Sequence, residues 1–164
     1  MIIRNIENKD AESFFYMLKK LDSENKFMMY EPNERKTSIG EIISKIEDIH
    51  KSGSLTLVVE KNNKIIGFLS ANRGFANRIK HSAYIVIGLL KDYTGMGIGT
   101  KLFKELDNWA LGNDITRLEL TVMVHNKNAV KLYKKMGFKI EGIKKKSLII
   151  DEQYIDEYYM AKIF

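Results

Sequence analysis

Three glycines at alternate positions are the residues of this chain best suited to hold an anion. Gly95, Gly97 and Gly99 lie within Tyr93–Thr100, between the apolar run Ala83–Leu90 and a segment with helical periodicity. Glycine leaves no side chain where the first turn of a helix presents unpaired backbone N–H groups. A phosphate-like group fits such a turn because the N–H groups and the helix dipole both favour negative charge. The spacing therefore predicts a nucleotide-containing ligand.

Two well-known glycine motifs fit this turn poorly. A dinucleotide-binding motif needs its third glycine one residue later, where Thr100 stands. A P-loop needs Gly-Lys-Ser/Thr, whereas this chain has Gly99-Thr100-Lys101. A turn without any ligand is the structural alternative. Three glycines in five residues would then cost backbone entropy without a packing benefit.

The segment Asn126–Phe138 is the second pattern of interest. Asn126 or Asn128 can cap a helix, and Gly137 can end it. Four side chains at helical spacing would share the buried face: Ala129, Leu132, Tyr133 and Met136. On this evidence alone, Asn126 is a helix cap and Tyr133 is part of the core.

Hydrophobic periodicity around these motifs predicts a mixed α/β sheet with flanking helices. Strands are expected at Met1–Ile6, Leu55–Glu60, Ile65–Ala71, Ser82–Lys91, Arg117–Val124, Phe138–Ile150 and Tyr154–Ile163. Helices are expected after Asn8 or Asp10, after the capping-box pair Ser38 and Glu41, after the glycine turn, and after Asn126 or Asn128. The strand Ser82–Lys91 is apolar almost throughout, which predicts burial on both faces. The order indicates antiparallel pairing first, one βαβ crossover in the middle and a hairpin last.

Composition and charge narrow the class of protein. The chain of 164 residues suits one domain, 1–164, with a proper core. It has no cysteine, which excludes a disulfide framework, a thiolate metal site and a cysteine nucleophile; no metal is predicted. Neither a signal peptide nor a membrane span is evident, so a soluble, cytoplasmic protein without a membrane partner is expected. The net charge of +6 suits an anionic partner. The lysines are spread along the chain, so this charge does not indicate nucleic acid in particular.

The two motifs together resemble those of the GNAT acyltransferase superfamily, whose members move an acetyl group from acetyl-CoA to an amine. The cofactor loop of that family reads Arg/Gln-Gly-x-Gly-x-Gly/Ala after a strand, and Thr94–Gly99 matches all but its first position. The second family block reads Asn-x-x-Ala-x-x-Leu-Tyr-x-x-x-Gly-Phe, and Asn126–Phe138 matches it throughout. The resemblance implies a mostly antiparallel sheet with a central parallel, splayed strand pair and flanking helices.

The resemblance also implies where acetyl-CoA binds. It would insert where the strands ending near Leu90 and Val124 splay apart, with backbone N–H groups of the glycine turn on the pyrophosphate. Backbone groups of Ile87 and Leu89 would pair with the pantetheine arm, and one of them would also polarise the thioester carbonyl. The implied cofactor-binding residues are Ile87, Leu89, Thr94, Gly95, Met96, Gly97, Ile98, Gly99, Thr100, Asn126 and Tyr133. Thr94 replaces the usual Arg or Gln, so a weaker pyrophosphate contact is expected there.

Catalysis needs a proton donor for the leaving sulfur and a route for the proton of the attacking amine. The motif position of Tyr133 makes it the family's usual general acid, and a phenol is protonated at neutral pH. Many GNAT enzymes have a carboxylate on the strand before the glycine loop, but Ser82–Leu90 contains none. We therefore predict Glu31, in the variable loop Asp22–Lys36, as the base. The alternatives are Glu119, Tyr84 and His81.

The sequence thus predicts an acetyl-CoA-dependent N-acetyltransferase that uses direct transfer in a ternary complex. The acceptor would be a primary amine on a small molecule, an amino acid or a protein. The variable loop and the terminal hairpin would form the acceptor side, where Asp151, Glu152, Asp156 and Glu157 could attract a cation. A non-catalytic acyl-CoA sensor is the alternative from a different class, and nucleic-acid binding ranks third. A homodimer is compatible with this prediction.

Overall fold

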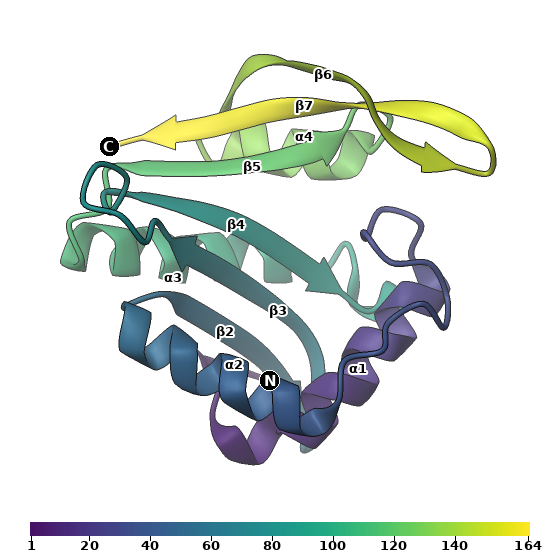
Figure 1. Cartoon of the computed structure of the whole chain (residues 1–164), viewed down its shortest axis with the longest axis vertical. Coiled ribbons are helices and arrows are strands. Elements are labelled where there is room, and N and C mark those ends of the chain that lie inside the picture. Colours follow the sequence, from purple (N-terminus) through teal and green to yellow (C-terminus); the bar gives the residue numbers. More distant parts are fainter.

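The computed structural model describes residues 1–164, which form one seven-stranded sheet with helices on both faces (Figure 1). The strands are β1 (Ile2–Asn5), β2 (Leu55–Lys61), β3 (Lys64–Arg73), β4 (Ser82–Leu89), β5 (Arg117–Met123), β6 (Lys139–Ile150) and β7 (Gln153–Ile163). The helices are α1 (Ala11–Glu24), α2 (Ile39–Ser52), α3 (Ile98–Gly112) and α4 (Lys127–Lys135). Two short 3₁₀ turns, η1 (Asn8–Asp10) and η2 (Lys91–Tyr93), complete the elements.

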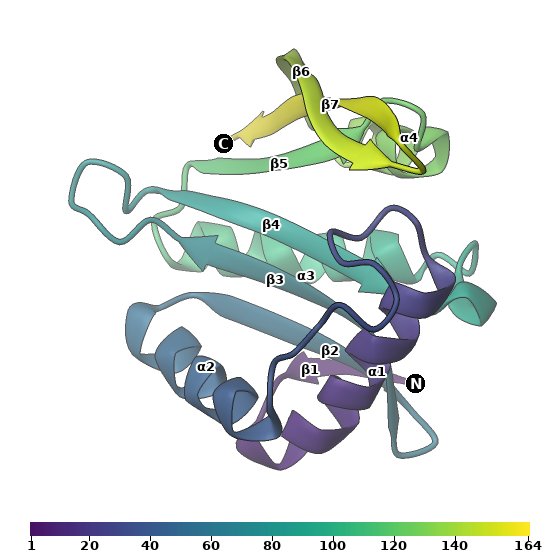
Figure 2. The same ribbon diagram turned by 45° about the vertical axis from the view of Figure 1, so that its right-hand side comes forward.

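The sheet has the order β1-β2-β3-β4-β5-β7-β6. Every neighbouring pair is antiparallel except β4 and β5, which are parallel and joined through α3. Helices α1 and α2 cover one face, and α3 lies behind the opposite face (Figures 1 and 2). The expected mixed fold, with a central parallel pair and a terminal hairpin, is confirmed. No helix combines the length and the apolarity that crossing a bilayer requires.

Local chemistry explains most element boundaries. Ser38 and Glu41 form the predicted capping box, in which each side chain accepts a hydrogen bond from the backbone N–H of the other residue. Asn62 and Asn63 adopt positive φ, as the tight β2–β3 hairpin requires.

Asp10 departs from its predicted role as a cap of α1, because its side chain makes no capping bond to that helix. Its buried carboxylate pairs with Arg4 at 2.7 Å and accepts a hydrogen bond from the N–H of Glu7. The Arg4 guanidinium holds the pKa of Asp10 below its ordinary value. The carboxylate therefore ties η1 to β1.

Strands β4 and β5 separate soon after they meet. Their pairing covers only Ser82–Arg117, Ala83–Leu118 and Tyr84–Glu119, after which the two strands diverge. The prediction that β4 is buried on both faces is therefore wrong for part of the strand. Ala83 and Ile85 are buried, but Tyr84 keeps 39% of its surface exposed because it faces the space between the diverging strands.

Candidate active site

One large cavity of about 1860 Å³ occupies the space that the divergence opens. Its lining comes from α1, from the segment between α1 and α2, from α2, and from strands β2 to β7. The turn that begins α3 and one side of α4 complete it. The cavity therefore brings together the two sequence motifs and the variable loop.

The glycine turn forms an open cradle at one end of this cavity. Gly95 and Gly97 both have φ of +75°, a left-handed conformation that side chains disfavour, and no atom lies within 4 Å of where their Cβ atoms would be. Gly97 is the N-cap of α3, so the free N–H groups of the first turn follow it directly. The empty space beside bare backbone fits a pyrophosphate.

Gly99 has a different function in the same turn. A Cβ at Gly99 would lie 2.7 Å from the Leu132 side chain on α4. Glycine is therefore required here for the close approach of α3 and α4, and the packing of one motif depends on the other.

Thr94 closes a turn beside the cavity, in place of the long side-chain donor that the family usually has at this position. Its hydroxyl donates to the carbonyl of Lys91 at 2.8 Å, and its N–H donates to the same carbonyl, so Thr94 closes the η2 turn. Positive charge at this end of the cavity comes from Lys91, Lys131 and Lys135, which all line it. These lysines make this end of the cavity positively charged.

The backbone of β4 offers unpaired hydrogen-bonding groups to the gap. Gly74 N donates to Ser82 O, and Leu90 N donates to Ile66 O, so the even-numbered residues of β4 direct their backbone groups to β3. The odd-numbered residues direct theirs to the opposite side, where β5 has diverged. Ile87 and Leu89 line the cavity there. An extended ligand can pair with them as a further strand.

Helix α4 contributes Asn126 and Tyr133. The Asn126 side chain accepts a hydrogen bond from Ala129 N at 3.3 Å, so it caps the helix while also lining the cavity. Tyr133 is 8% exposed and packs edge-on against Phe103. Burial, and to a smaller extent the neighbouring Tyr84, raise the pKa of the Tyr133 hydroxyl above its ordinary value. Tyr133 is therefore both a core residue and a neutral donor at the cavity wall.

Two predicted residues do not reach the cavity. Met96 is 61% exposed on the outside of the glycine turn and is absent from the lining. Glu31 is exposed, and its backbone N–H binds the Glu34 carboxylate at 2.8 Å. The structure therefore does not place Glu31 where it could accept a proton from the acceptor amine.

Glu157, expected from the sequence only as a charge that could attract a cation, lines the cavity. It lies on β7 opposite Met123, close to where β5 ends. An irregularity in β6 between Lys144 and Leu148 brings the Ser147 hydroxyl to Glu157, to which it donates a hydrogen bond. No sequence spacing joins Glu157 to the motifs, because the β5–β7 register alone brings it here.

Of the three alternative bases, only Tyr84 lines the cavity. Glu119 accepts a hydrogen bond from Arg117 at 2.7 Å and does not line the cavity, and His81 is exposed outside it. Tyr84 lines the cavity, where its hydroxyl is 2.7 Å from Thr121 Oγ1 across the diverging strands. Asp156 binds the N–H of Lys146, which lowers the pKa of that carboxyl.

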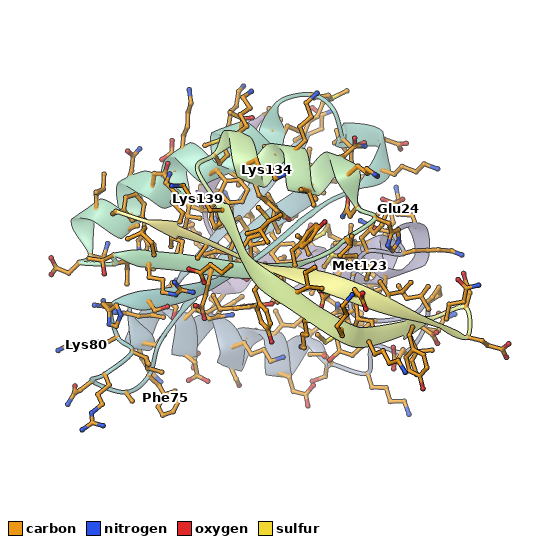
Figure 3. All side chains as sticks on the ribbon, turned by 90° about the horizontal axis from the view of Figure 1, so that it is seen from above. Glu24, Phe75, Lys80, Met123, Lys134 and Lys139 are labelled. Carbon is orange, nitrogen blue, oxygen red and sulfur yellow. The ribbon has the colours of Figure 1, made fainter.

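A short segment at the end of α1 crosses the open mouth of the strand pair. Glu24 accepts a hydrogen bond from Lys91 N, just after β4, and Phe27 contacts the His125 ring, just after β5. We call Glu24–Phe27 the strap. Figure 3 places Glu24 and Met123 toward the same end of the molecule, opposite Phe75 and Lys80 of the β3–β4 loop. Arg35 forms an ion pair with the buried Asp22 at 2.6 Å, which ties the segment between α1 and α2 to the end of α1.

These features define a class of enzyme that binds a long ligand bearing a pyrophosphate at one end and an extended, strand-like arm at the other. The model of the Acetyltransferase (GNAT) family matches residues 14–138. The chain belongs to this family. It is therefore an acyltransferase whose acyl donor is acetyl-CoA, as the two motifs predicted.

Individual relatives agree with this assignment. The chain is 34% identical over 117 residues to the L-amino acid N-acetyltransferase AaaT of Escherichia coli (strain K12), covering 69% of this chain and 70% of that protein. The structure of a GNAT-family acetyltransferase from Streptococcus pneumoniae is 31% identical, with a TM-score of 0.96 and 99% of each chain covered. The structure of yncA from Salmonella typhimurium, solved with acetyl-CoA, shares the fold at 16% identity, with a TM-score of 0.87; 99% of this chain and 92% of that chain are covered.

Proposed function

We propose that residues 1–164 act as one domain that transfers the acetyl group of acetyl-CoA directly to the primary amine of a small molecule, with amino acids as the first acceptors to consider. The observation that carries this proposal is the continuity of the site. The glycine cradle leads directly into a strand gap with unpaired backbone groups, and both line one cavity. The relative AaaT, named for L-amino acids, supports the choice of acceptor.

The donor is held mainly by backbone. The N–H groups of Gly95, Gly97, Ile98, Gly99 and Thr100 bind the pyrophosphate, and Lys91, Lys131 and Lys135 add positive charge. Ile87 and Leu89 pair with the pantetheine arm through their gap-facing backbone groups. An N–H of this strand also donates to the thioester carbonyl, where negative charge develops during attack.

The acceptor amine must be neutral to attack the carbonyl carbon. Glu157 replaces Glu31 as our proposed base, because its carboxylate lines the cavity and is oriented by Ser147. It accepts the proton that the amine nitrogen loses, directly or through a water molecule, as the new C–N bond forms. The C–S bond then breaks, and the electron pair leaves with the sulfur of coenzyme A.

Tyr133 acts on the departing sulfur. Its raised pKa keeps the hydroxyl protonated throughout the physiological range. An ordinary thiol has a pKa of about 8.5, so a phenol with a raised pKa does not readily give its proton away completely to a thiolate. We therefore propose that Tyr133 assists mainly by donating a strong hydrogen bond to the developing thiolate.

A panel of amines tests this function. Purified protein, acetyl-CoA and each amine are mixed, and release of the coenzyme A thiol is followed together with the acetylated product by mass spectrometry. We expect turnover with at least one neutral amino acid or simple primary amine. Binding of acetyl-CoA by calorimetry without turnover on any amine would instead indicate an acyl-CoA sensor. The cytoplasmic location and a homodimer stay predictions, tested by fractionation and by light scattering.

A further inference from the structure

Three consecutive lysines, Lys144, Lys145 and Lys146, lie at the irregularity of β6 and take different positions. Lys145 forms an ion pair with Asp156 at 3.2 Å. Lys146 donates its backbone N–H to the same carboxylate at 2.8 Å, and its ammonium lies 4.8 Å from the centre of the Tyr154 ring. Lys144 has neither kind of partner, and of the three it alone lines the cavity. The fold therefore leaves one free ammonium group of this run at the cavity.

Lys144 and the proposed base are direct neighbours across the hairpin. In the β6–β7 register Lys144 lies opposite Glu157, so both side chains project from the same face of the sheet, and both line the cavity. Residues in this relation have Cβ atoms about 5 Å apart. No ion pair joins the two side chains, and Glu157 accepts the hydrogen bond of Ser147 instead. An ammonium and a carboxylate are thus presented side by side to a ligand.

The other cations that line the cavity are paired or belong to other parts of it. Lys26 and Arg35 form ion pairs with Asp151 and Asp22. Lys45 has no such partner, but it belongs to α2, which lies beside β2 and β3, toward the opposite edge of the sheet from the β6–β7 hairpin (Figures 1 and 2). The remaining three lysines lie at the donor end, as described above. The hairpin that contributes the proposed base therefore contributes a single unpaired cation beside it.

An α-amino acid carries charges that match this pair. Its amino group and its carboxylate are bonded to the same carbon atom, so they occupy neighbouring positions in any bound orientation. When the amino group lies at Glu157, the carboxylate can meet the Lys144 ammonium. A simple amine brings no negative charge, so Lys144 repels its protonated form without a compensating attraction. A polyamine brings a second positive charge and is repelled more strongly.

We propose that Lys144 determines the specificity of the acceptor site: its ammonium binds the α-carboxylate of an amino acid while Glu157 accepts the proton of the amino group. This proposal rests on the proposed acetyl transfer. The carboxylate takes no part in bond making or breaking and stays on the product, an N-acetylated amino acid. The contact between Lys144 and the carboxylate is a charge-assisted hydrogen bond, the stronger class of such bonds.

Phenylalanine and phenethylamine provide a matched test, because they differ only in the α-carboxylate. The wild-type enzyme should favour phenylalanine in kcat/KM. Lys144→Gln should lower the ratio of phenylalanine to phenethylamine by about tenfold, the low end for a hydrogen bond between charged groups, because Lys144 is exposed. Lys144→Arg should preserve the ratio. Comparing the ratios of two variants cancels any difference in intrinsic reactivity between the two amines.

Two further lysines serve as controls. Lys139→Gln removes an exposed lysine of the same strand that does not line the cavity, and it should leave the ratio as in the wild type. Lys45→Gln removes the unpaired cation of α2 and should also leave the ratio unchanged. A lower ratio in Lys45→Gln together with an unchanged ratio in Lys144→Gln would overturn the role of Lys144. All three lysines are exposed, so the melting temperature of each variant should equal that of the wild type.

Salt and charge reversal test the electrostatic origin of the preference. Added salt should reduce the wild-type ratio and leave that of Lys144→Gln unchanged, because ions screen the contact between the ammonium and the carboxylate. Lys144→Glu would place two carboxylates next to each other and should raise the activity with spermidine relative to phenylalanine. A wild-type preference for phenethylamine or spermidine over phenylalanine would contradict the proposal.

Binding separates this proposal from the proposed function. Isothermal titration of the coenzyme A-loaded protein with phenylalanine reports occupancy without requiring turnover. Binding of phenylalanine that is lost in Lys144→Gln, without acetylation of any amine, would preserve the carboxylate contact and overturn the transferase. Acetylation of both amines with the same ratio in the wild type and in Lys144→Gln would preserve the transferase and overturn the role of Lys144.

Discussion

The two ends of the cavity are built on different principles. The donor end consists of consecutive elements, β4, the glycine turn, α3, β5 and α4, and it presents mostly backbone groups. The acceptor end gathers side chains from α1, α2, β2, β3 and the β6–β7 hairpin, which are far apart in the sequence. We therefore expect the donor end to tolerate changes of side chains that leave its backbone conformation intact. We expect single substitutions at the acceptor end to change which amine binds.

The contrast extends to how each end is held in place. Glycine conformation and the contact of Gly99 with Leu132 fix the donor end. Ion pairs and hydrogen bonds fix the acceptor end: Arg35 with Asp22, Ser147 with Glu157, and Glu24 with the backbone of Lys91. Substitutions of the glycines that set the backbone conformation of the donor end should therefore abolish binding of acetyl-CoA. Substitutions at the acceptor end should instead alter rates, selectivity or stability.

The largest effect is expected from Gly97→Glu, which places bulk and negative charge in the donor cradle at a φ of +75°. Binding of acetyl-CoA should fall below detection in isothermal titration calorimetry. The control Gly112→Glu makes the same change at the other end of α3, also in open space, and should bind as the wild type does. Normal binding by Gly97→Glu would mean that the donor lies elsewhere.

Tyr133→Phe should give the next largest effect, a fall in kcat of about 100-fold with little change in the Kd for acetyl-CoA. The exposed Tyr16→Phe on α1 is the matched control. A variant of Tyr133 with full activity would remove the hydroxyl from the mechanism.

The pH profile gives a second check on Tyr133. A phenol with a raised pKa stays protonated as the pH rises through about 10, where an ordinary tyrosine ionises. The wild-type kcat should therefore show no alkaline decline due to Tyr133 up to about pH 10. A decline near pH 9 that Tyr133→Phe abolishes would contradict the raised pKa.

Glu157→Gln should lower kcat/KM by about 10- to 100-fold at neutral pH, because the amine proton loses its acceptor. The loss should shrink at alkaline pH, where more of the free amine is already neutral. Glu152→Gln, at the exposed tip of the same hairpin, is the control and should have no effect. A constant loss across the pH range would assign Glu157 a role in binding rather than in proton transfer.

The smallest effect on turnover is expected from the ion pairs that hold the variable loop Asp22–Lys36 in place. Arg35→Ala leaves the carboxylate of Asp22 buried without its partner and should lower the free energy of unfolding by about 2–3 kcal/mol. Lys26→Ala removes a fully exposed pair with Asp151 and should leave the denaturation midpoint unchanged. Equal stability of the two variants in urea denaturation would show that the buried pair does not hold the loop.

The sequence predicts the donor end better than the acceptor end for a physical reason. Glycine spacing, capping residues and strand periodicity are local signals, so the glycine turn and the cap at Asn126 could be placed in advance, whereas the positions of Ile87 and Leu89 come only from the resemblance to the family. Local signals also place the order of strands and helices. They do not give the early end of the β4–β5 pairing, which is why Tyr84 is more exposed than an apolar strand suggests.

The acceptor end depends on contacts between distant segments, which no spacing encodes. Glu31 and Glu157 are both carboxylates in polar surroundings, and only the fold separates the exposed one from the one that lines the cavity. Lys144, Lys145 and Lys146 likewise look equivalent in the sequence, and only the fold shows that Lys144 alone lines the cavity.

The brief pairing of β4 with β5 has a consequence for the life of the protein in a cell. Three residue pairs join two half-sheets, and in the proposed complex the pantetheine arm of acetyl-CoA continues the interrupted ladder between them. Ligands that bind only the native state protect it in proportion to their concentration. Starvation for acetyl-CoA should therefore expose the seam to proteases and shorten the half-life of the enzyme when its substrate is scarce.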